Sequence, residues 1–175
     1  MKYEITDIVH PNNPNLKRIR ALKDFSGVKA GELGGWIESE KNLSQDGTCW
    51  VSGDAQVWDD AKVNGNAQVF GNAKVYGNAK VSGNARISGN SKVFGNSKVF
   101  GDAKVYDNTW VFGNARINGN SKVFGNSKVF GNTWVFGNAV VCGNSKVFGD
   151  SETDKPVYKT IVMDGVKYKL VPDDA

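Results

Sequence analysis

The sequence is poor in cysteine and histidine and has no long hydrophobic run. It contains two cysteines, one histidine and four prolines in 175 residues. These are too few cysteines for a disulfide framework and too few histidines for a three-histidine metal site, and no apolar run reaches the ~18 residues of a membrane span. Met1-Lys2-Tyr3-Glu4 does not resemble a signal peptide. We therefore expect a cytoplasmic protein that neither contacts a membrane nor uses a metal or cofactor.

What the sequence has in abundance is a six-residue repeat. The 102 residues from Gly47 to Phe148 divide by six into 17 units without an insertion, and Gly71-Asn72-Ala73-Lys74-Val75-Tyr76 is a clean copy. Each unit runs glycine, asparagine or aspartate, a small residue, a long polar residue, valine or isoleucine, then a variable residue. A short fixed period predicts a solenoid, whose units bury a hydrophobic face only by stacking on their neighbours.

The repeat predicts one short strand and one corner per unit. Within the strand, Ala73 and Val75 share one face and Lys74 and Tyr76 the other, because side chains alternate. The Gly-Asn pair suits a corner, since both residues tolerate positive φ. Disorder is disfavoured because every unit carries a β-branched residue in register. We therefore expect the valines and the small residues two positions earlier to line a narrow interior.

These units resemble the bacterial hexapeptide-repeat family, and the resemblance implies an all-β, left-handed parallel β-helix. Members of this family have a triangular cross-section with three units per coil, and Val75 and Ala73 match their inward aliphatic and small residues. Catalytic members are commonly trimers built through flat sides. The resemblance therefore implies a homo-oligomer, either a dimer or a trimer.

We divide the chain into three parts, namely 1–46 as an N-terminal cap and entry coil, 47–148 as the solenoid, and 149–175 as a C-terminal β-hairpin cap. Lys2 to Val9 is predicted to form a strand, whereas Leu16 to Phe25 fits either a helix or a strand. Ile37 and Leu43 stand six apart but are two residues out of step with Val51. The ends are expected to cover the open edges of the solenoid.

The hairpin prediction rests on Asp164-Gly165, a strong signal for a two-residue turn. It places Met163 opposite Val166 and Ile161 opposite Tyr168, with Leu170 on the same apolar face. The period also places the cysteines. Cys49 is expected to point inward and Cys142 outward, about five coils apart, so that they cannot form an intrachain disulfide.

A coil of 18 residues would stack every third unit, which sorts the outward residues into columns. One column is wholly aromatic, and the column beside it is rich in lysine. The aromatic column consists of Trp58, Tyr76, Phe94, Phe112, Phe130 and Phe148. The neighbouring column consists of Gln56, Lys74, Lys92, Trp110, Lys128 and Lys146. We call the first the aromatic ladder and the second the lysine column.

Three interpretations of the aromatic ladder remain open. Stacked rings stabilise a parallel solenoid without any partner. The rings form an apolar patch larger than monomers usually expose, which favours covering by the termini or by another subunit. Sugars or bases could also stack on the rings.

Charge adds a further option. The repeat carries 11 basic and five acidic side chains, a net charge of +6, which would suit single-stranded nucleic acid or an acidic polysaccharide. Lysine is also the usual solubilising residue, so we do not favour a polyanion. Asn72, Asn90, Asn108 and Asn126 are expected to form an amide ladder at a corner.

The catalytic members of the family use a histidine as general base, and this sequence offers only His10. It precedes Pro11 in a polar loop outside the repeat, where we expect it to be exposed to solvent. The N-terminal run, including Leu33-Gly34-Gly35-Trp36-Ile37-Glu38, resembles uncharacterised phage and prophage hexapeptide-repeat proteins. The sequence thus predicts a non-catalytic structural or interaction module with a host or phage protein as partner. An acyltransferase-like enzyme and a polyanion-binding module are the alternatives.

Overall fold

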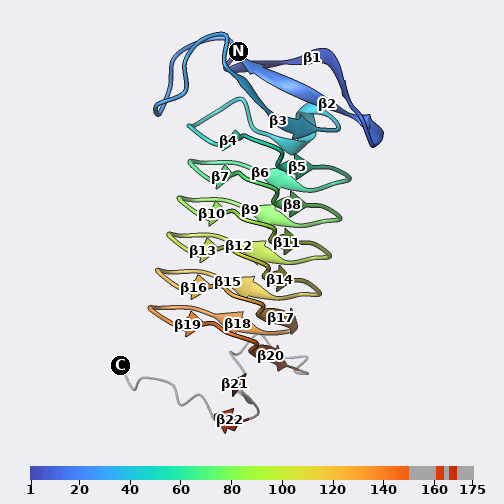
Figure 1. The fold of residues 1–175 in the computed structure, drawn as a ribbon. Coiled ribbons are helices and arrows are strands. Elements are labelled where there is room, and N and C mark those ends of the chain that lie inside the picture. Colours follow the sequence, from blue (N-terminus) through green and yellow to red (C-terminus); the bar gives the residue numbers. More distant parts are fainter. Residues whose placement is uncertain (150–160, 164–165, 169–175) are drawn as a thin grey trace.

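The chain folds as an all-β solenoid of about six turns (Figure 1). The computed structural model describes residues 1–149, 161–163 and 166–168. Within this part of the chain the only helical element is the 3-10 turn η1 (Glu40–Asn42). The predicted β-solenoid is confirmed.

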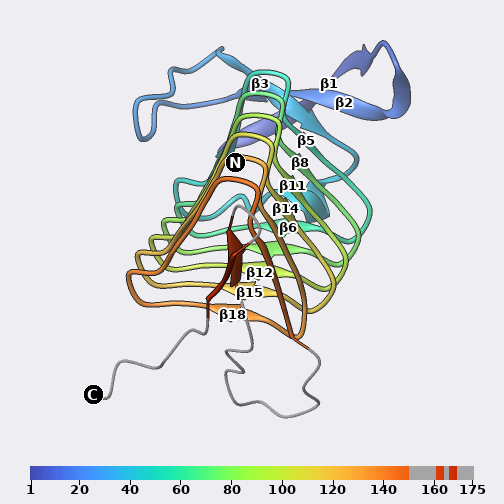
Figure 2. The same ribbon diagram turned by 60° about the horizontal axis from the view of Figure 1, so that its bottom comes forward.

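Three parallel sheets form the sides of the shaft, and Figure 2 shows the coils superimposed on a roughly triangular outline. The six-stranded sheet contains β4 (Trp50–Val51), β7 (Gln68–Val69), β10 (Arg86–Ile87), β13 (Lys104–Val105), β16 (Lys122–Val123) and β19 (Val140–Val141). The five-stranded sheet contains β6 (Lys62–Val63), β9 (Lys80–Val81), β12 (Lys98–Val99), β15 (Arg116–Ile117) and β18 (Trp134–Val135).

The third sheet has eleven strands because the chain ends extend it. Its shaft strands are β5 (Gln56–Val57), β8 (Lys74–Val75), β11 (Lys92–Val93), β14 (Trp110–Val111), β17 (Lys128–Gly131) and β20 (Lys146–Gly149). Before them come β1 (Tyr3–His10), β2 (Asn13–Ala21) and β3 (Leu33–Ile37), and after them β21 (Ile161–Met163) and β22 (Val166–Tyr168).

Successive coils are in the register that the repeat predicts. Val93 pairs with Val75 on one side and with Val111 on the other, so equivalent residues are 18 positions apart. The backbone N–H of Lys74 donates to the carbonyl of Ser91 at 2.9 Å, and the same bond recurs along the shaft. Three hexapeptides therefore close one coil, as expected.

The interior is filled by the two predicted inward positions. The valines and isoleucines at the fifth position of the units are at most 4% exposed, and nearly all the alanines, serines and threonines two positions earlier are also buried. Each of these polar residues has a local acceptor. Ser97, for example, donates to the carbonyl of Phe94 at 2.8 Å. Buried hydroxyls are thus satisfied without interrupting the core. Cys49 is buried and Cys142 lies on the outer surface, and both are free thiols, as predicted.

Glycine at the corners is required by both conformation and space. Gly95 has φ of 69°, and a Cβ placed there would lie 3.0 Å from the backbone nitrogen of Gly113 one coil later. Two units have aspartate instead, and Asp59 and Asp107 keep positive φ values of 55° and 62°. The carboxylate of Asp107 accepts a hydrogen bond from the N–H of Gly125 at 3.0 Å. A side chain is therefore tolerated where it can bond to the next coil.

The N-terminal cap covers the first coil with an antiparallel hairpin of β1 and β2 (Figure 1). The segment that fitted either a helix or a strand is a strand up to Ala21, because Ile19 pairs with Ile5 and is buried against the core. The hydroxyl of Tyr3 donates to the carbonyl of Leu43 at 2.6 Å. The register offset is confirmed, since Ile37 pairs with Val57, 20 positions later.

Lys2 lies beneath this cap with only 1% of its surface exposed. Its ammonium group donates to the carbonyl of Cys49 at 2.9 Å and lies 5.5 Å from the ring centroid of Phe25. Burying a cation requires such partners, so these contacts fix the start of the chain against the entry coil.

At the other end, β20 pairs antiparallel with β21, and β21 pairs with β22. The predicted hairpin register is confirmed, because Met163 pairs with Val166 and Ile161 with Tyr168. The turn at Asp164-Gly165 and the predicted apolar contact of Leu170 lie outside the described residues.

We predict that Gly95→Ala destabilises the shaft by ~1–2 kcal/mol, because alanine is strained at positive φ. Gly95→Asp is the matched control, since aspartate occupies the equivalent corner at Asp59 and Asp107. Thermal unfolding followed by circular dichroism should show a clearly larger loss for alanine. Equal losses for both variants would contradict the conformational explanation.

Candidate interaction surface

The aromatic ladder forms one continuous stack along the eleven-stranded sheet. Each ring follows an inward valine, and consecutive ring centroids lie 4.5, 4.9, 5.0, 5.0 and 5.4 Å apart from Trp58 to Phe148. The planes of neighbouring rings differ by 1° to 15°. All six predicted ladder residues are therefore brought together by the spacing of the coils.

This geometry decides which part of each ring is available to a partner. The faces of the inner rings lie against neighbouring rings, at separations that leave no room for a planar ligand between them. The rings are half-buried, and only Phe148 at the end of the stack reaches 40% exposure. The ladder therefore offers ring edges to a partner. Bases and sugars bind aromatic faces, so this surface suits another apolar surface better than stacked ligands.

The lysine column beside the ladder is interrupted by Trp110. The ammonium groups of Lys92 and Lys128, from the coils on either side, lie 4.6 and 4.9 Å from the indole. The ring of Phe94 also approaches Trp110 edge-on, with centroids 6.3 Å apart. Cation–π attraction stabilises ammonium groups over an indole by ~0.5–1 kcal/mol at exposed sites. Trp110 thus separates charges that would otherwise repel one another.

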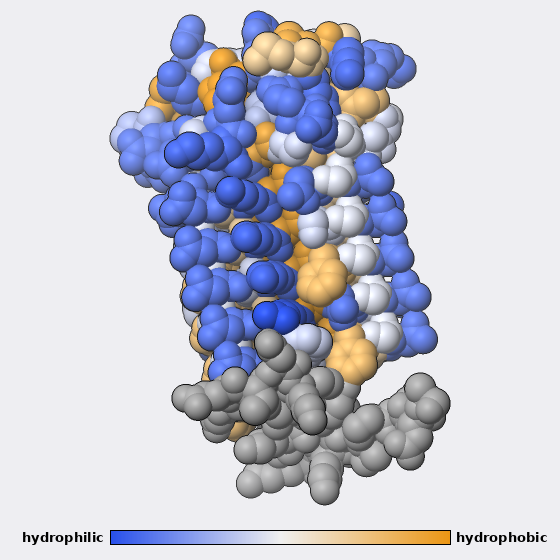
Figure 3. Space-filling model, turned by 180° about the vertical axis from the view of Figure 1, so that it is seen from behind, coloured by the Kyte–Doolittle hydropathy of each residue, from blue (hydrophilic) through white to orange (hydrophobic). Residues whose placement is uncertain are grey.

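The other two sides of the shaft lack a continuous ladder. Tyr106 and Phe124 stack at 4.9 Å on the six-stranded sheet, and Arg116 lies 4.7 Å from the ring of Trp134 on the five-stranded sheet. Figure 3 shows one side of the shaft, where hydrophilic side chains form rows parallel to the axis beside a narrow hydrophobic strip. The eleven-stranded sheet alone therefore carries an unbroken apolar column within the described residues.

Asparagine ladders run along the corners. The side-chain amide of Asn72 donates to Asn90 at 3.1 Å, and Asn90 and Asn108 continue the chain to Asn126 at the same distance. A parallel ladder links Asn78, Asn96, Asn114 and Asn132 at the corner next to the aromatic ladder. Each amide uses one N–H donor and its carbonyl oxygen within the ladder. The main role of these asparagines is therefore to link successive coils of the shaft.

Near the N-terminal end of the aromatic ladder, the phenol of Tyr76 lies close to the carboxylate of Asp59 at a corner of the shaft. Partial burial raises the pKa of the Tyr76 phenol, and the nearby Asp59 carboxylate raises it further. Asp59 itself accepts a hydrogen bond from the N–H of Gly77 at 3.0 Å. The phenol therefore stays neutral at physiological pH and adds no negative charge to the ladder.

His10 corrects the sequence analysis, because it is half-buried rather than a free loop side chain. Its ring packs edge-on against Trp36 with centroids 4.8 Å apart, and its Nε2 lies 3.3 Å from the amide nitrogen of Gln56. The guanidinium of Arg18 lies 4.8 Å from the same indole. Trp36 pairs with Gln56, so this cluster extends the lysine column into the cap. In the sequence, the only indication that His10 would lie beside Trp36 was the two-residue offset of the entry coil.

Within the described residues, no three histidine, cysteine, aspartate or glutamate side chains converge as metal ligands. Nor does this part of the chain contain a helix with the length and apolar character to cross a bilayer.

These observations define a hexapeptide-repeat-like β-solenoid. No family profile matches the chain. A 39-residue stretch is 49% identical to a protein of Escherichia coli (strain K12) named "Uncharacterized acetyltransferase YdcK". The match covers 22% of this chain and 12% of that protein. The similarity therefore extends over a small part of either protein.

We predict that Trp110→Lys makes stability depend on salt. The variant would place five lysines in succession at strand spacing, and exposed like charges repel less when salt screens them. Its melting temperature should rise relative to wild type between low and moderate salt. Trp110→Gln removes the ring without adding charge and should lose stability without this salt response. A salt response shared by both variants would contradict the role given to Trp110.

Proposed function

We propose that the protein is a non-catalytic structural module that assembles with copies of itself through the aromatic ladder. The observation that supports this most directly is the continuous stack of six rings with only their edges outward. An apolar strip of this length is unusual on a monomer surface. In a two-fold dimer the ladder of the second copy would cover it, because such an interface is formed by the same surface of both copies.

Charge favours one arrangement of the copies. Along each strand the lysine column lies on one side of the ladder, and the asparagine corner containing Asn96 and Asn114 lies on the other. In a two-fold dimer with antiparallel shafts, the two lysine columns would face each other. A symmetry axis parallel to the shafts instead sets each lysine column against the partner's asparagine corner. We therefore propose a parallel dimer or trimer.

The biological setting is a further part of the proposal. The N-terminal run Arg18 to Glu38 resembles phage and prophage hexapeptide-repeat proteins, which supports an accessory structural role in a bacterial cytoplasm. In that setting a host or phage protein could meet the same strip. Binding of a polyanion to the lysine side chains is a less favoured alternative, and it would not require the faces of the aromatic rings.

Replacing Phe94, Phe112 and Phe130 with serine should abolish assembly while leaving the shaft folded. Light scattering after size-exclusion chromatography should show the wild type as an oligomer and the variant as a monomer, with the strand signal in circular dichroism retained. The control is Tyr106→Ser with Phe124→Ser, a stacked pair on another side, which should leave the oligomer intact.

Two outcomes would contradict the assembly. A monomeric wild type would remove it directly, and so would a triple variant that remains oligomeric. Unfolding of the triple variant would show that the rings mainly stabilise the shaft, at ~0.5–1.5 kcal/mol per stacked pair. In that case the single variant Phe112→Ser should still weaken the oligomer if the ladder is an interface.

The similarity to a protein named as an acetyltransferase supports acyl transfer as a second candidate. The general base would have to be His10, the one histidine of the sequence, and its ring lies against Trp36 rather than in an open cleft. If the protein is non-catalytic, calorimetric titration with acetyl-CoA should give no saturable heat. Saturable binding that His10→Ala weakens would support the enzyme instead.

A further inference from the structure

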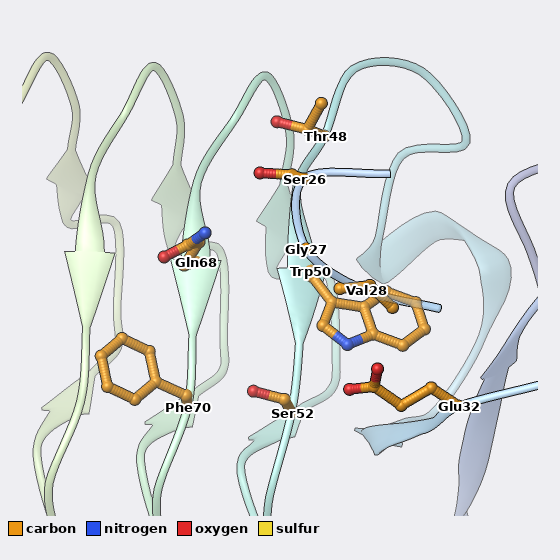
Figure 4. Close-up of a pocket in the computed structure, with 9 residues that line it drawn as sticks. All are labelled: Ser26, Gly27, Val28, Glu32, Thr48, Trp50, Ser52, Gln68 and Phe70. Atoms are coloured by element: carbon orange, nitrogen blue, oxygen red, sulfur yellow. The ribbon is translucent and has the colours of Figure 1, made fainter. Parts of the chain in front are cut away.

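A hollow of about 300 Å³ lies between the N-terminal loop and the six-stranded sheet (Figure 4). The loop is fixed there by two features. Phe25 and Val28 form a bridge around a two-residue turn with positive φ at Ser26 and Gly27, and the ring of Phe25 packs edge-on against Trp50 at 5.4 Å. This pocket lies on a different side of the shaft from the aromatic ladder. The N-terminal loop forms one wall of this pocket, so the pocket does not recur in the other coils of the shaft.

Phe70 provides a free aromatic face at the mouth of the pocket. Its neighbours along the axis, Ser52 and Ser88, are small, whereas each inner ring of the aromatic ladder lies between two others. No other ring stacks on Phe70 within the described residues, and 38% of it is exposed. An aromatic face of this kind is a suitable platform for the C–H face of a sugar ring.

The remaining lining groups are hydrogen-bonding and carry one negative charge. Gln68 can donate and accept, Ser52 can do both, and Glu32 contributes a carboxylate that also accepts from the N–H of Lys29 at 3.1 Å. No lysine or arginine lines the pocket. A carboxylate with no cation beside it disfavours phosphates and uronates.

Trp50 supplies an independent indication of a polar ligand. It is 4% exposed, and its indole Nε1 is a buried donor without a hydrogen-bond partner in the described part of the chain. Figure 4 shows this nitrogen on the side of the ring that faces Ser52 and Glu32. Buried donors are rarely left unpaired, so a rotation of the indole that brings this nitrogen to the pocket wall would let a ligand hydroxyl satisfy it.

We propose that this pocket binds a neutral sugar. Sugar hydroxyls donate to Glu32 and Gln68 and accept from Ser52, Gln68 and the indole, while the ring packs on the open face of Phe70. The pocket volume lies at the lower end of the range for small-molecule sites, which suits one or two sugar rings. The proposal does not depend on assembly through the aromatic ladder.

The test is saturation-transfer NMR on the full chain with glucose, galactose, mannose, N-acetylglucosamine and glucuronate at millimolar concentrations. At least one neutral sugar should receive saturation from the wild type, and glucuronate should receive less. Phe70→Ser should weaken that binding by at least about tenfold. This variant keeps the fold because serine occupies the same column at Ser52 and Ser88. Phe70→Leu, which keeps the apolar bulk, is the second variant if serine destabilises the coil.

Phe100→Ser is the matched control. Phe100 occupies the equivalent position on the five-stranded sheet, between Ser82 and Asn118, and does not line the pocket. Its replacement should leave sugar binding unchanged, whereas Glu32→Gln should reduce the discrimination against glucuronate. The proposal is overturned if no neutral sugar receives saturation, if Phe70→Ser binds like the wild type, or if glucuronate binds best.

Discussion

Hydrogen bonds between the backbones of successive coils determine the position of nearly every side chain. The donor and acceptor are 17 residues apart, as in the bond from Asn72 to Gly89, and equivalent residues stack 18 apart. Once this spacing holds, any residue type repeated at every third unit becomes a column. The aromatic ladder, the lysine column and the asparagine corners are all consequences of this one register, and an insertion that shifts the register would interrupt all of them.

The same spacing explains how much of the fold the sequence predicts. The inward position of Val75, the stacking of Phe94 on Phe112 and the amide ladder through Asn90 follow from the period alone, and the structure confirms them. The left-handed turn rests on the family resemblance. The cap is different because it has no period. Whether Leu16 to Ala21 forms a strand depends on its pairing with β1, a contact that local sequence does not encode.

The surface was less predictable than the shaft. The period predicts the column to which a residue belongs, but it does not predict which residues of the N-terminal cap contact that column. His10 lies against Trp36 because the entry coil is 20 residues long, and the pocket beside Trp50 exists because the loop returns to the six-stranded sheet. Both arise where the chain departs from its repeat. Such departures are the places where a solenoid of near-identical units can acquire individual sites.

The contrast between Phe112 and Phe70 shows how one residue type serves two purposes on the same scaffold. Phe112 has a ring above and below it, so both faces are used and only an edge remains for a flat partner. Phe70 lies between serines and keeps a face for a ligand. A complete column therefore favours stability and assembly, whereas a single aromatic residue in a column of small residues favours recognition. The neighbours 18 positions away determine which of the two a phenylalanine can do.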